Sequence, residues 1–182
     1  MQPVIIHPWN LTEEEALQLQ SDLATKVERQ DRFDSIKYIA GVDVAYAKEN
    51  EQLVAAVVIL DAKTLDVIET ATAADREQFP YIPGLFSFRE LPPLINAFDK
   101  LKQQPDLIVC DGQGYSHPRR FGLASHLGVI FDIPTIGCGK TRLIGEHKDP
   151  DKTRGATSPL VDNGETIGNV LRIQDGIKPM YV

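Results

Sequence analysis

The sequence contains few cysteines and no long apolar run. Cys110 and Cys138 are its two cysteines, and each lies in a short apolar run that is typical of a buried strand, so we expect two unreactive core thiols. No apolar run approaches the roughly 18 residues that a membrane span needs. The N-terminal segment also lacks the basic start and apolar centre of a secretory signal. These features predict a cytoplasmic protein without a disulfide or a membrane segment.

Cations and histidines are also scarce. The chain has 19 lysines and arginines against 26 aspartates and glutamates, which gives a formal charge of −7, and it has 4 histidines. This balance argues against a protein that coats nucleic acid by bulk electrostatics, although a local basic cleft is compatible with it. So few histidines and cysteines disfavour a zinc site. The length of 182 residues suits one domain.

The hydrophobic pattern predicts an α/β fold built on a mixed sheet. Thr12 and Glu15 form a capping-box pattern at the start of an amphipathic helix that reaches residue 28. Three β-branched runs then predict an antiparallel meander over residues 38–46, 53–60 and 65–73. Parallel strands with crossover helices follow, as helix 94–102, strand 106–112, helix 118–132 and strand 134–140.

The C-terminal part has a different pattern. Asn163-Gly164 between two extended runs predicts a hairpin, and residues 177–182 predict one more strand. The polar segment 145–158 is the longest predicted loop, which we interpret as a flexible excursion over a site.

Three carboxylates occupy positions that aspartate and glutamate rarely take. Asp43 interrupts a β-branched strand, Asp111 ends an apolar strand and Glu90 interrupts the apolar stripe of a helix. Each also has an ordinary explanation: Asp43 as a charge on an edge strand, Asp111 as the start of an Asp-Gly turn, and Glu90 as the partner of Arg89 or a lysine. Taken together they predict an oxygen-rich site for Mg²⁺ or Mn²⁺, because a hard cation neutralises clustered carboxylates. Such a site can hydrolyse phosphodiesters.

Glycines and cations follow Asp111. Gly112 and Gly122 allow close backbone approach, and the segment between them carries His117, Pro118 and Arg119. Pro118 suits the first turn of a helix, whose N-terminus attracts anions. Lys140 follows the next strand and would lie at the same sheet edge as Asp111. The alternatives are an ordinary Asp-Gly turn and a solvated lysine.

Several motifs, in order along the chain, resemble the endonuclease V family of deoxyinosine-cleaving nucleases, which has a ribonuclease-H-like fold. They are IAGVDVAY, PYIPGLFSFRE, PDLIVCDGQGYSHPRRFGLASHLGV and IPTIGCGKTRL. The resemblance implies that Asp43, Glu90 and Asp111 bind metal and that these carboxylates act in catalysis with Lys140. It also implies a substrate-binding set comprising Pro80, Tyr81, Ile82, Pro83, Gly84, Leu85, Arg89, Gly112, His117, Arg119 and Gly122.

In this family the Pro-Tyr-x-Pro segment is a wedge that enters the duplex where the lesion nucleotide has been extruded. Two prolines stiffen such a loop before binding, and Tyr81 offers a ring that can replace lost stacking. Without the resemblance, the segment is an ordinary aromatic loop over the core. Pro92 and Pro93 should kink or restart the helix that carries Glu90.

The resemblance implies Mg²⁺-dependent hydrolysis of the second phosphodiester on the 3′ side of deoxyinosine, which leaves 3′-hydroxyl and 5′-phosphate ends. The implied partner is DNA with deoxyinosine or other lesions, and some members also act on inosine in RNA. We expect a monomer with one endonuclease domain, residues 1–182. Family members continue beyond the KPMYV motif, so we expect this domain to be C-terminally short. Two alternatives remain: a ribonuclease-H-like binding module that cuts poorly, and a phosphohydrolase of small substrates.

Overall fold

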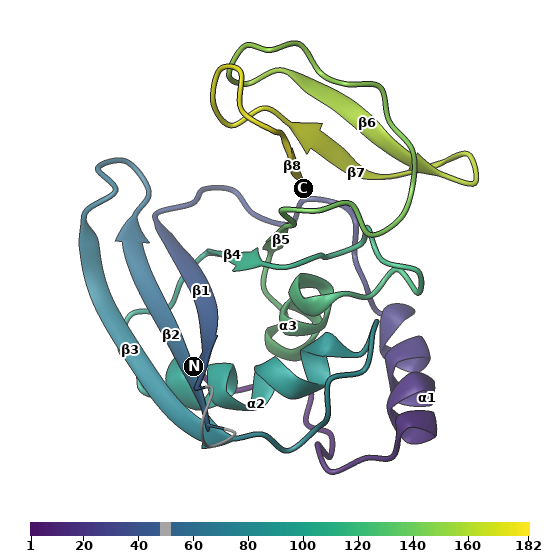
Figure 1. The fold of residues 1–182 in the computed structure, drawn as a ribbon. Helices are drawn as coiled ribbons and strands as arrows, with labels where there is room; N and C mark the ends of the chain where they lie inside the picture. The colour runs from purple at the N-terminus through teal and green to yellow at the C-terminus, as the bar shows by residue number, and fades with distance from the viewer. Residues whose placement is uncertain (48–51) are drawn as a thin grey trace.

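The computed structural model describes residues 1–47 and 52–182 and contains two β-sheets. The larger sheet has the strand order β3-β2-β1-β4-β5 (Figure 1). Its strands β1 and β2 are antiparallel, as are β2 and β3, whereas β4 pairs parallel with both β1 and β5. The predicted meander and the predicted parallel strands are therefore confirmed. The strands are β1 (Tyr38–Tyr46), β2 (Gln52–Asp61), β3 (Val67–Arg76), β4 (Leu107–Asp111) and β5 (Thr135–Cys138).

The first helix, α1 (Glu13–Ala24), has the predicted capping box. The Glu15 N–H donates to Thr12 Oγ1 at 3.3 Å, and the Thr12 N–H donates to Glu15 Oε2 at 2.8 Å. The helix ends four residues earlier than predicted, so Val27 lies beyond it. Apolar periodicity marks the face of a helix better than its end, because helix ends depend on local caps.

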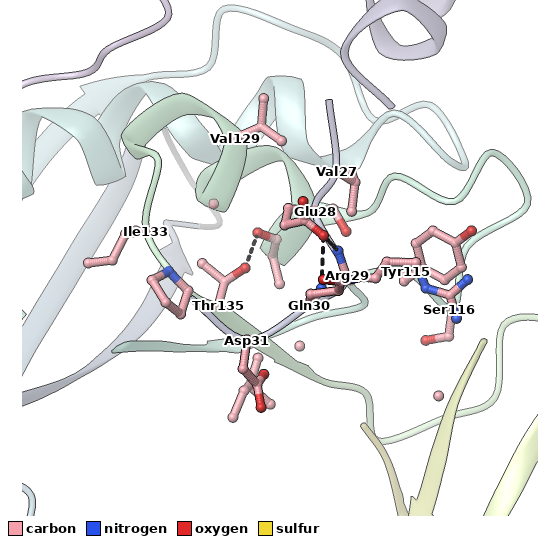
Figure 2. Close-up of a pocket in the computed structure, with 18 of the residues that line it drawn as sticks. Val27, Glu28, Arg29, Gln30, Asp31, Tyr115, Ser116, Val129, Ile133 and Thr135 are labelled. Atoms are coloured by element: carbon pink, nitrogen blue, oxygen red, sulfur yellow. Dashed lines mark hydrogen bonds between the residues drawn. The ribbon is translucent and has the colours of Figure 1, made fainter. Parts of the chain in front are cut away.

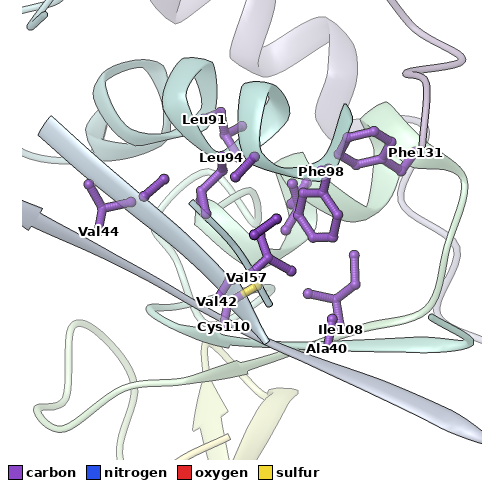
Figure 3. Packing of buried hydrophobic residues seen from close by; sticks show 14 of the residues in the cluster. Ala40, Val42, Val44, Val57, Leu91, Leu94, Phe98, Ile108, Cys110 and Phe131 are labelled. Carbon is purple, nitrogen blue, oxygen red and sulfur yellow. The ribbon is translucent and has the colours of Figure 1, made fainter. Parts of the chain in front are cut away.

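The second helix, α2 (Phe86–Asp99), is continuous through Pro92 and Pro93. The expected restart is therefore wrong, and the helix begins well before the predicted range of 94–102. Each proline removes one backbone donor, but both rings are buried. Leu91, Leu94 and Phe98 pack on the sheet, and this burial holds the helix together despite the lost hydrogen bonds (Figure 3).

The third helix, α3 (Leu123–Phe131), begins five residues later than predicted. Residues 114–119 form bends and turns, and Arg120 has φ 55°, which a right-handed helix excludes. Gly122 is the N-cap residue. Helices α2 and α3 share one core with the sheet, built from side chains such as Val42, Ile108, Leu94 and Leu127.

A smaller sheet contains β6 (Thr157–Asp162), β7 (Glu165–Leu171) and β8 (Met180–Tyr181). Figure 1 shows it as a separate layer beyond β4 and β5. Asn163 and Gly164 have φ 50° and 82°, so the predicted hairpin and the final strand are confirmed. Gly139 and Tyr181 form a bridge between the layers.

The predicted loop over residues 145–158 packs along the smaller sheet. Glu146 bridges to Val161, and the Arg172 guanidinium donates to the carbonyls of Pro150 and Asp151 at 3.0 and 3.2 Å. Both cysteines are free thiols, as predicted, although Cys138 is only half-buried. In the described part of the chain, every helix is too short or too polar to span a membrane.

Candidate active site

Asp43 and Asp111 lie side by side on two parallel strands, Asp111 as the last residue of β4 and Asp43 within β1. Val42 pairs with Cys110 across β1 and β4, so the next residue on each strand is one of the two aspartates. Adjacent strands are roughly 4.8 Å apart, which places these carboxylates close together. Both aspartates are exposed, whereas Val42 and Cys110 are buried. The Asp43 carboxylate is therefore accessible to solvent, although its strand neighbours Val42 and Val44 are buried.

Glu90 approaches from the helix layer and is only 5% exposed. The pKa of Glu90 is raised to about 7, chiefly by burial and to a smaller extent by the charges of Asp43 and Asp111. The Tyr46 hydroxyl donates to Glu90 Oε1. This hydrogen bond and the charge of Arg89 lower the Glu90 pKa and so offset part of the increase. The three carboxylates are therefore near enough to affect one another, as a shared site requires. The partner of Glu90 is Tyr46, whereas the sequence suggested Arg89 or a lysine.

Lys140 contacts Asp111 from the end of β5. Its Nζ lies 2.5 Å from Asp111 Oδ2, while the lysine side chain is 74% exposed. This contact, with a smaller effect of the Asp43 charge, raises the pKa of Lys140. The structure thus brings Lys140 to the sheet edge that carries the two aspartates. An ammonium here is charged at neutral pH and is accessible to an anionic substrate.

The donor chemistry suits a hard divalent cation, because all three acidic side chains supply carboxylate oxygens. Within residues 1–47 and 52–182, however, there is no group of three or more histidine, cysteine, aspartate or glutamate side chains arranged to hold a metal ion. Instead, Glu90 accepts from Tyr46 and Asp111 pairs with Lys140. The electrostatic strain on Glu90 is the kind that a bound cation relieves. The metal-ligand assignment of the three carboxylates stays a prediction.

The segment from Pro80 to Leu85 forms a turn before α2, in which Pro80, Tyr81 and Pro83 are exposed and Leu85 is buried. Tyr81 is 65% exposed, and its ring lies 6.4 Å from the Phe86 ring, edge to face. Ile82, in contrast, packs on the buried cluster that contains Phe79 and Leu85. Gly84 has φ 83°, and a Cβ there would lie 2.6 Å from Arg119 Nη2. The turn therefore requires glycine, and it presents a tyrosine while an adjacent apolar side chain anchors it.

His117 and Arg119 contact this turn from the segment before α3. His117 is 4% exposed, and burial, with the charges of Arg119 and Arg120, lowers its pKa to about 4. Its Nδ1 accepts from the Arg119 N–H at 3.2 Å, and the ring also hydrogen-bonds the Gly84 backbone. Arg119 Nη2 donates to the Gly84 carbonyl at 2.8 Å. At pH 7 the imidazole is neutral, so Arg119 supplies the cation at this contact.

The other predicted substrate residues have packing partners. Arg89 Nη1 lies 2.6 Å from Glu77 Oε1, and its guanidinium stacks over the Tyr46 ring at 5.0 Å. A Cβ on Gly112 would lie 3.1 Å from the Leu123 side chain, and one on Gly122 would lie 2.3 Å from the Gln113 carbonyl. These two glycines let the strand end pack on α3.

Two backbone donors at the start of α3 already have acceptors within the protein. The N–H of Gly122 donates to the Gly114 carbonyl, and the N–H of Ala124 donates to the Gln113 carbonyl. The helix also begins at Leu123, so Pro118 does not occupy its first turn. The expectation of a helix that starts near Pro118 is therefore wrong, whereas anion binding by this segment stays a prediction. The physical cause of the later start is the turn at Arg120, which delays the helix.

A cavity of about 480 Å³ lies away from the carboxylates. It is bounded by residues 26–33, α3, β5, β7 and Val182 (Figure 2). Glu28, Arg29, Tyr115 and Thr135 are among the residues that line it, and the Arg29 guanidinium lies 4.4 Å from the centre of the Tyr115 ring. Among the described residues, its lining includes none of the three acidic site residues.

Sequence reasoning missed Tyr46 and Gln20. Tyr46 is the last residue of β1, and no sequence signal showed that its hydroxyl would reach Glu90. Gln20 lies four residues after Ala16 and three before Leu23, and all three are buried. A glutamine on the buried stripe of an amphipathic helix was therefore a visible signal, because buried polar groups need partners.

Comparisons with known proteins agree with the motifs. A family model described as Endonuclease V matches residues 21–182. Endonuclease V of Trichormus variabilis is 49% identical over 177 residues, which cover 97% of this chain and 80% of that protein. Endonuclease V of Streptomyces coelicolor is 47% identical over 176 residues, which cover 96% and 76%.

Solved structures give the same result. The structure of Endonuclease V from Bacillus subtilis has a TM-score of 0.93 at 33% identity, and the match covers 100% of this chain and 80% of that one. Human ENDOV has a TM-score of 0.82 at 28% identity, with 93% and 82% covered. Endonuclease V of Ciona intestinalis, in complex with a 24mer DNA containing an inosine followed by a ribo-adenosine, has a TM-score of 0.79 at 25% identity, with 92% and 80% covered. These matches confirm the expected ribonuclease-H-like fold class.

Proposed function

The chain belongs to the endonuclease V family of nucleases, and from this premise we propose that it is a DNA-repair endonuclease specific for deoxyinosine. It hydrolyses the second phosphodiester on the 3′ side of the lesion and leaves 3′-hydroxyl and 5′-phosphate ends. The observation that carries this proposal is the strand register that sets Asp43 beside Asp111, with Lys140 in contact with Asp111 and the charges of both aspartates acting on Glu90. The Ciona relative, whose structure contains inosine DNA, supports the choice of substrate.

Asp43, Glu90 and Asp111 would hold Mg²⁺, with Mn²⁺ as a substitute. Bound there, the ion would polarise a phosphoryl oxygen and make an attacking water more acidic. Lys140 is placed to stabilise negative charge on the phosphoryl group, because its exposed ammonium lies next to Asp111. Tyr46 fixes the Glu90 carboxylate through its hydroxyl.

The turn from Pro80 to Leu85 recognises the lesion. Tyr81 projects into solvent and would stack on the bases that border an extruded nucleotide. The turn leads directly into α2, so the wedge and Glu90 belong to one rigid connection. Hypoxanthine would be selected by backbone groups near Gly84 and Leu85, at a position that leaves no room for the exocyclic amine of guanine.

A nicking assay tests the proposal. A labelled duplex with one deoxyinosine is incubated with protein, with and without Mg²⁺, and the products are sized and tested for a ligatable 5′-phosphate. We expect one nick, at the second phosphodiester on the 3′ side, that EDTA prevents. Asp43→Ala should abolish it, whereas Asp34→Asn, which removes a charge from an exposed position, should not.

The remaining alternatives give different results. Lesion binding without any product would indicate a binding module. Turnover of small phosphodiesters that Tyr81→Ala leaves unchanged would indicate a general phosphohydrolase, since the wedge would then have no purpose. A parallel assay with inosine-containing RNA decides the choice between DNA and RNA.

A further inference from the structure

Gln20 is a buried polar residue in a helix that carries none of the proposed catalytic groups. It lies in α1, and its side chain is 1% exposed. A buried amide is costly unless its donors and acceptor are satisfied. The contacts of this one side chain therefore show what it does.

The Gln20 amide joins two segments that are far apart in the sequence. Its Nε2 donates to the Gly84 carbonyl at 2.9 Å and to the Phe121 carbonyl at 2.8 Å. Its Oε1 accepts from Arg119 Nε. Both amide protons and the oxygen are thus used, and α1 links the turn before α2 to the segment before α3.

Three side chains converge on the Gly84 peptide. Gln20 and Arg119 both donate to its carbonyl, and the His117 ring hydrogen-bonds the same backbone. This carbonyl is therefore drawn toward the protein, and the left-handed conformation of Gly84 is fixed from outside the turn. Rotation of the peptide would leave one of the two buried Gln20 amide protons without its acceptor.

We propose that Gln20 is a positioning residue that sets lesion selectivity by holding the Gly84 turn in its binding conformation. The inference rests on the proposed function, in which this turn borders the extruded base. A turn that is ordered before binding pays less conformational entropy when the base enters. Release of the turn should therefore weaken lesion binding, while the carboxylate site, which Gln20 does not touch, retains its chemistry.

The test replaces Gln20 by methionine, which has a similar length but no hydrogen-bonding amide. Gln18→Met is the matched control, since Gln18 lies on the same helix but is exposed, and its amide donates to Asp22 Oδ1 at 2.9 Å, away from the turn. Binding to duplexes with and without deoxyinosine is measured in Ca²⁺, and single-turnover cleavage is measured in Mg²⁺ at saturating protein. We expect Gln20→Met to lose roughly tenfold in lesion affinity, with binding to undamaged DNA and the saturated cleavage rate changed less than about twofold. Gln18→Met should match the wild type.

Two further measurements keep the inference falsifiable. Hydrogen exchange of the backbone amides of Tyr81, Ile82, Gly84 and Leu85 should accelerate in Gln20→Met and not in Gln18→Met. Gln20→Glu keeps an acceptor for Arg119 but loses the donors to Gly84 and Phe121, so it should show the same loss of selectivity. Unchanged exchange in this turn, or an unchanged ratio of lesion to undamaged binding in both folded variants, would overturn the inference. If the wild type does not recognise deoxyinosine, the proposed function fails, and the exchange experiment still decides whether Gln20 holds the turn.

Discussion

Replacing Glu90 by glutamine should stabilise the protein at alkaline pH and have little effect near pH 4.5. The carboxyl group is buried beside two other acids, and its pKa rises from the ordinary value of 4.5 to about 7. Between these values the folded chain holds a proton that the unfolded chain has lost. The free energy of unfolding therefore falls as the pH rises through this window. Glutamine cannot ionise, but it still offers an oxygen to the Tyr46 hydroxyl.

The magnitude follows from the width of the window. Each pH unit contributes about 1.4 kcal/mol per proton, so roughly 2.5 units amount to about 3 kcal/mol. His117 acts in the opposite direction, because its pKa is lowered to about 4 and its contribution to stability rises with pH up to about 6.5. The wild type and Glu90→Gln share that histidine, so its effect cancels in the difference between them.

Urea denaturation at several pH values between 4.5 and 8, in EDTA, measures this difference. The stability advantage of Glu90→Gln over the wild type should grow with pH and level off above pH 7. Asp34→Asn, which removes an exposed acid, should follow the wild type at every pH. Parallel stability curves for the wild type and Glu90→Gln would refute the argument that burial and neighbouring charge hold the Glu90 proton.

Two further predictions concern packing and the buried histidines. Gly122→Ala should lower the free energy of unfolding by about 2 kcal/mol, because the added Cβ would lie 2.3 Å from the Gln113 carbonyl. The control is Gly41→Ala, where an added Cβ would have nothing within 4 Å. This variant should be nearly neutral in the same denaturation assay. His7 Nδ1 donates to the Pro8 carbonyl at 2.9 Å, so its Nε2 must accept from His126 Nε2 at 3.0 Å. Burial lowers both histidine pKa values, and nitrogen NMR at pH 8 should therefore show two neutral rings with opposite tautomers; a single shared tautomer would contradict this hydrogen-bond chain.

The sequence predicted the strands and the carboxylates better than the helix ends. Asp43 and Asp111 were recognisable because an acid within or at the end of a β-branched run is unusual, whatever its partners are. The start of α3 was predicted too early because apolar periodicity continues through residues whose backbone turns at Arg120. The continuity of α2 through Pro92 and Pro93 was also missed, since local propensity carries no information about how strongly a helix is packed.

The sequence by itself determined the strand pattern, the identity of the acidic groups and the resemblance of the motifs to one nuclease family, because these are properties of short segments and their order. Only the tertiary structure decided which groups meet. It brought Tyr46 to Glu90, Lys140 to Asp111 and Gln20 to the Gly84 turn. Those contacts join segments up to 64 residues apart, and they depend on the packing of whole helices and strands, which local patterns do not encode.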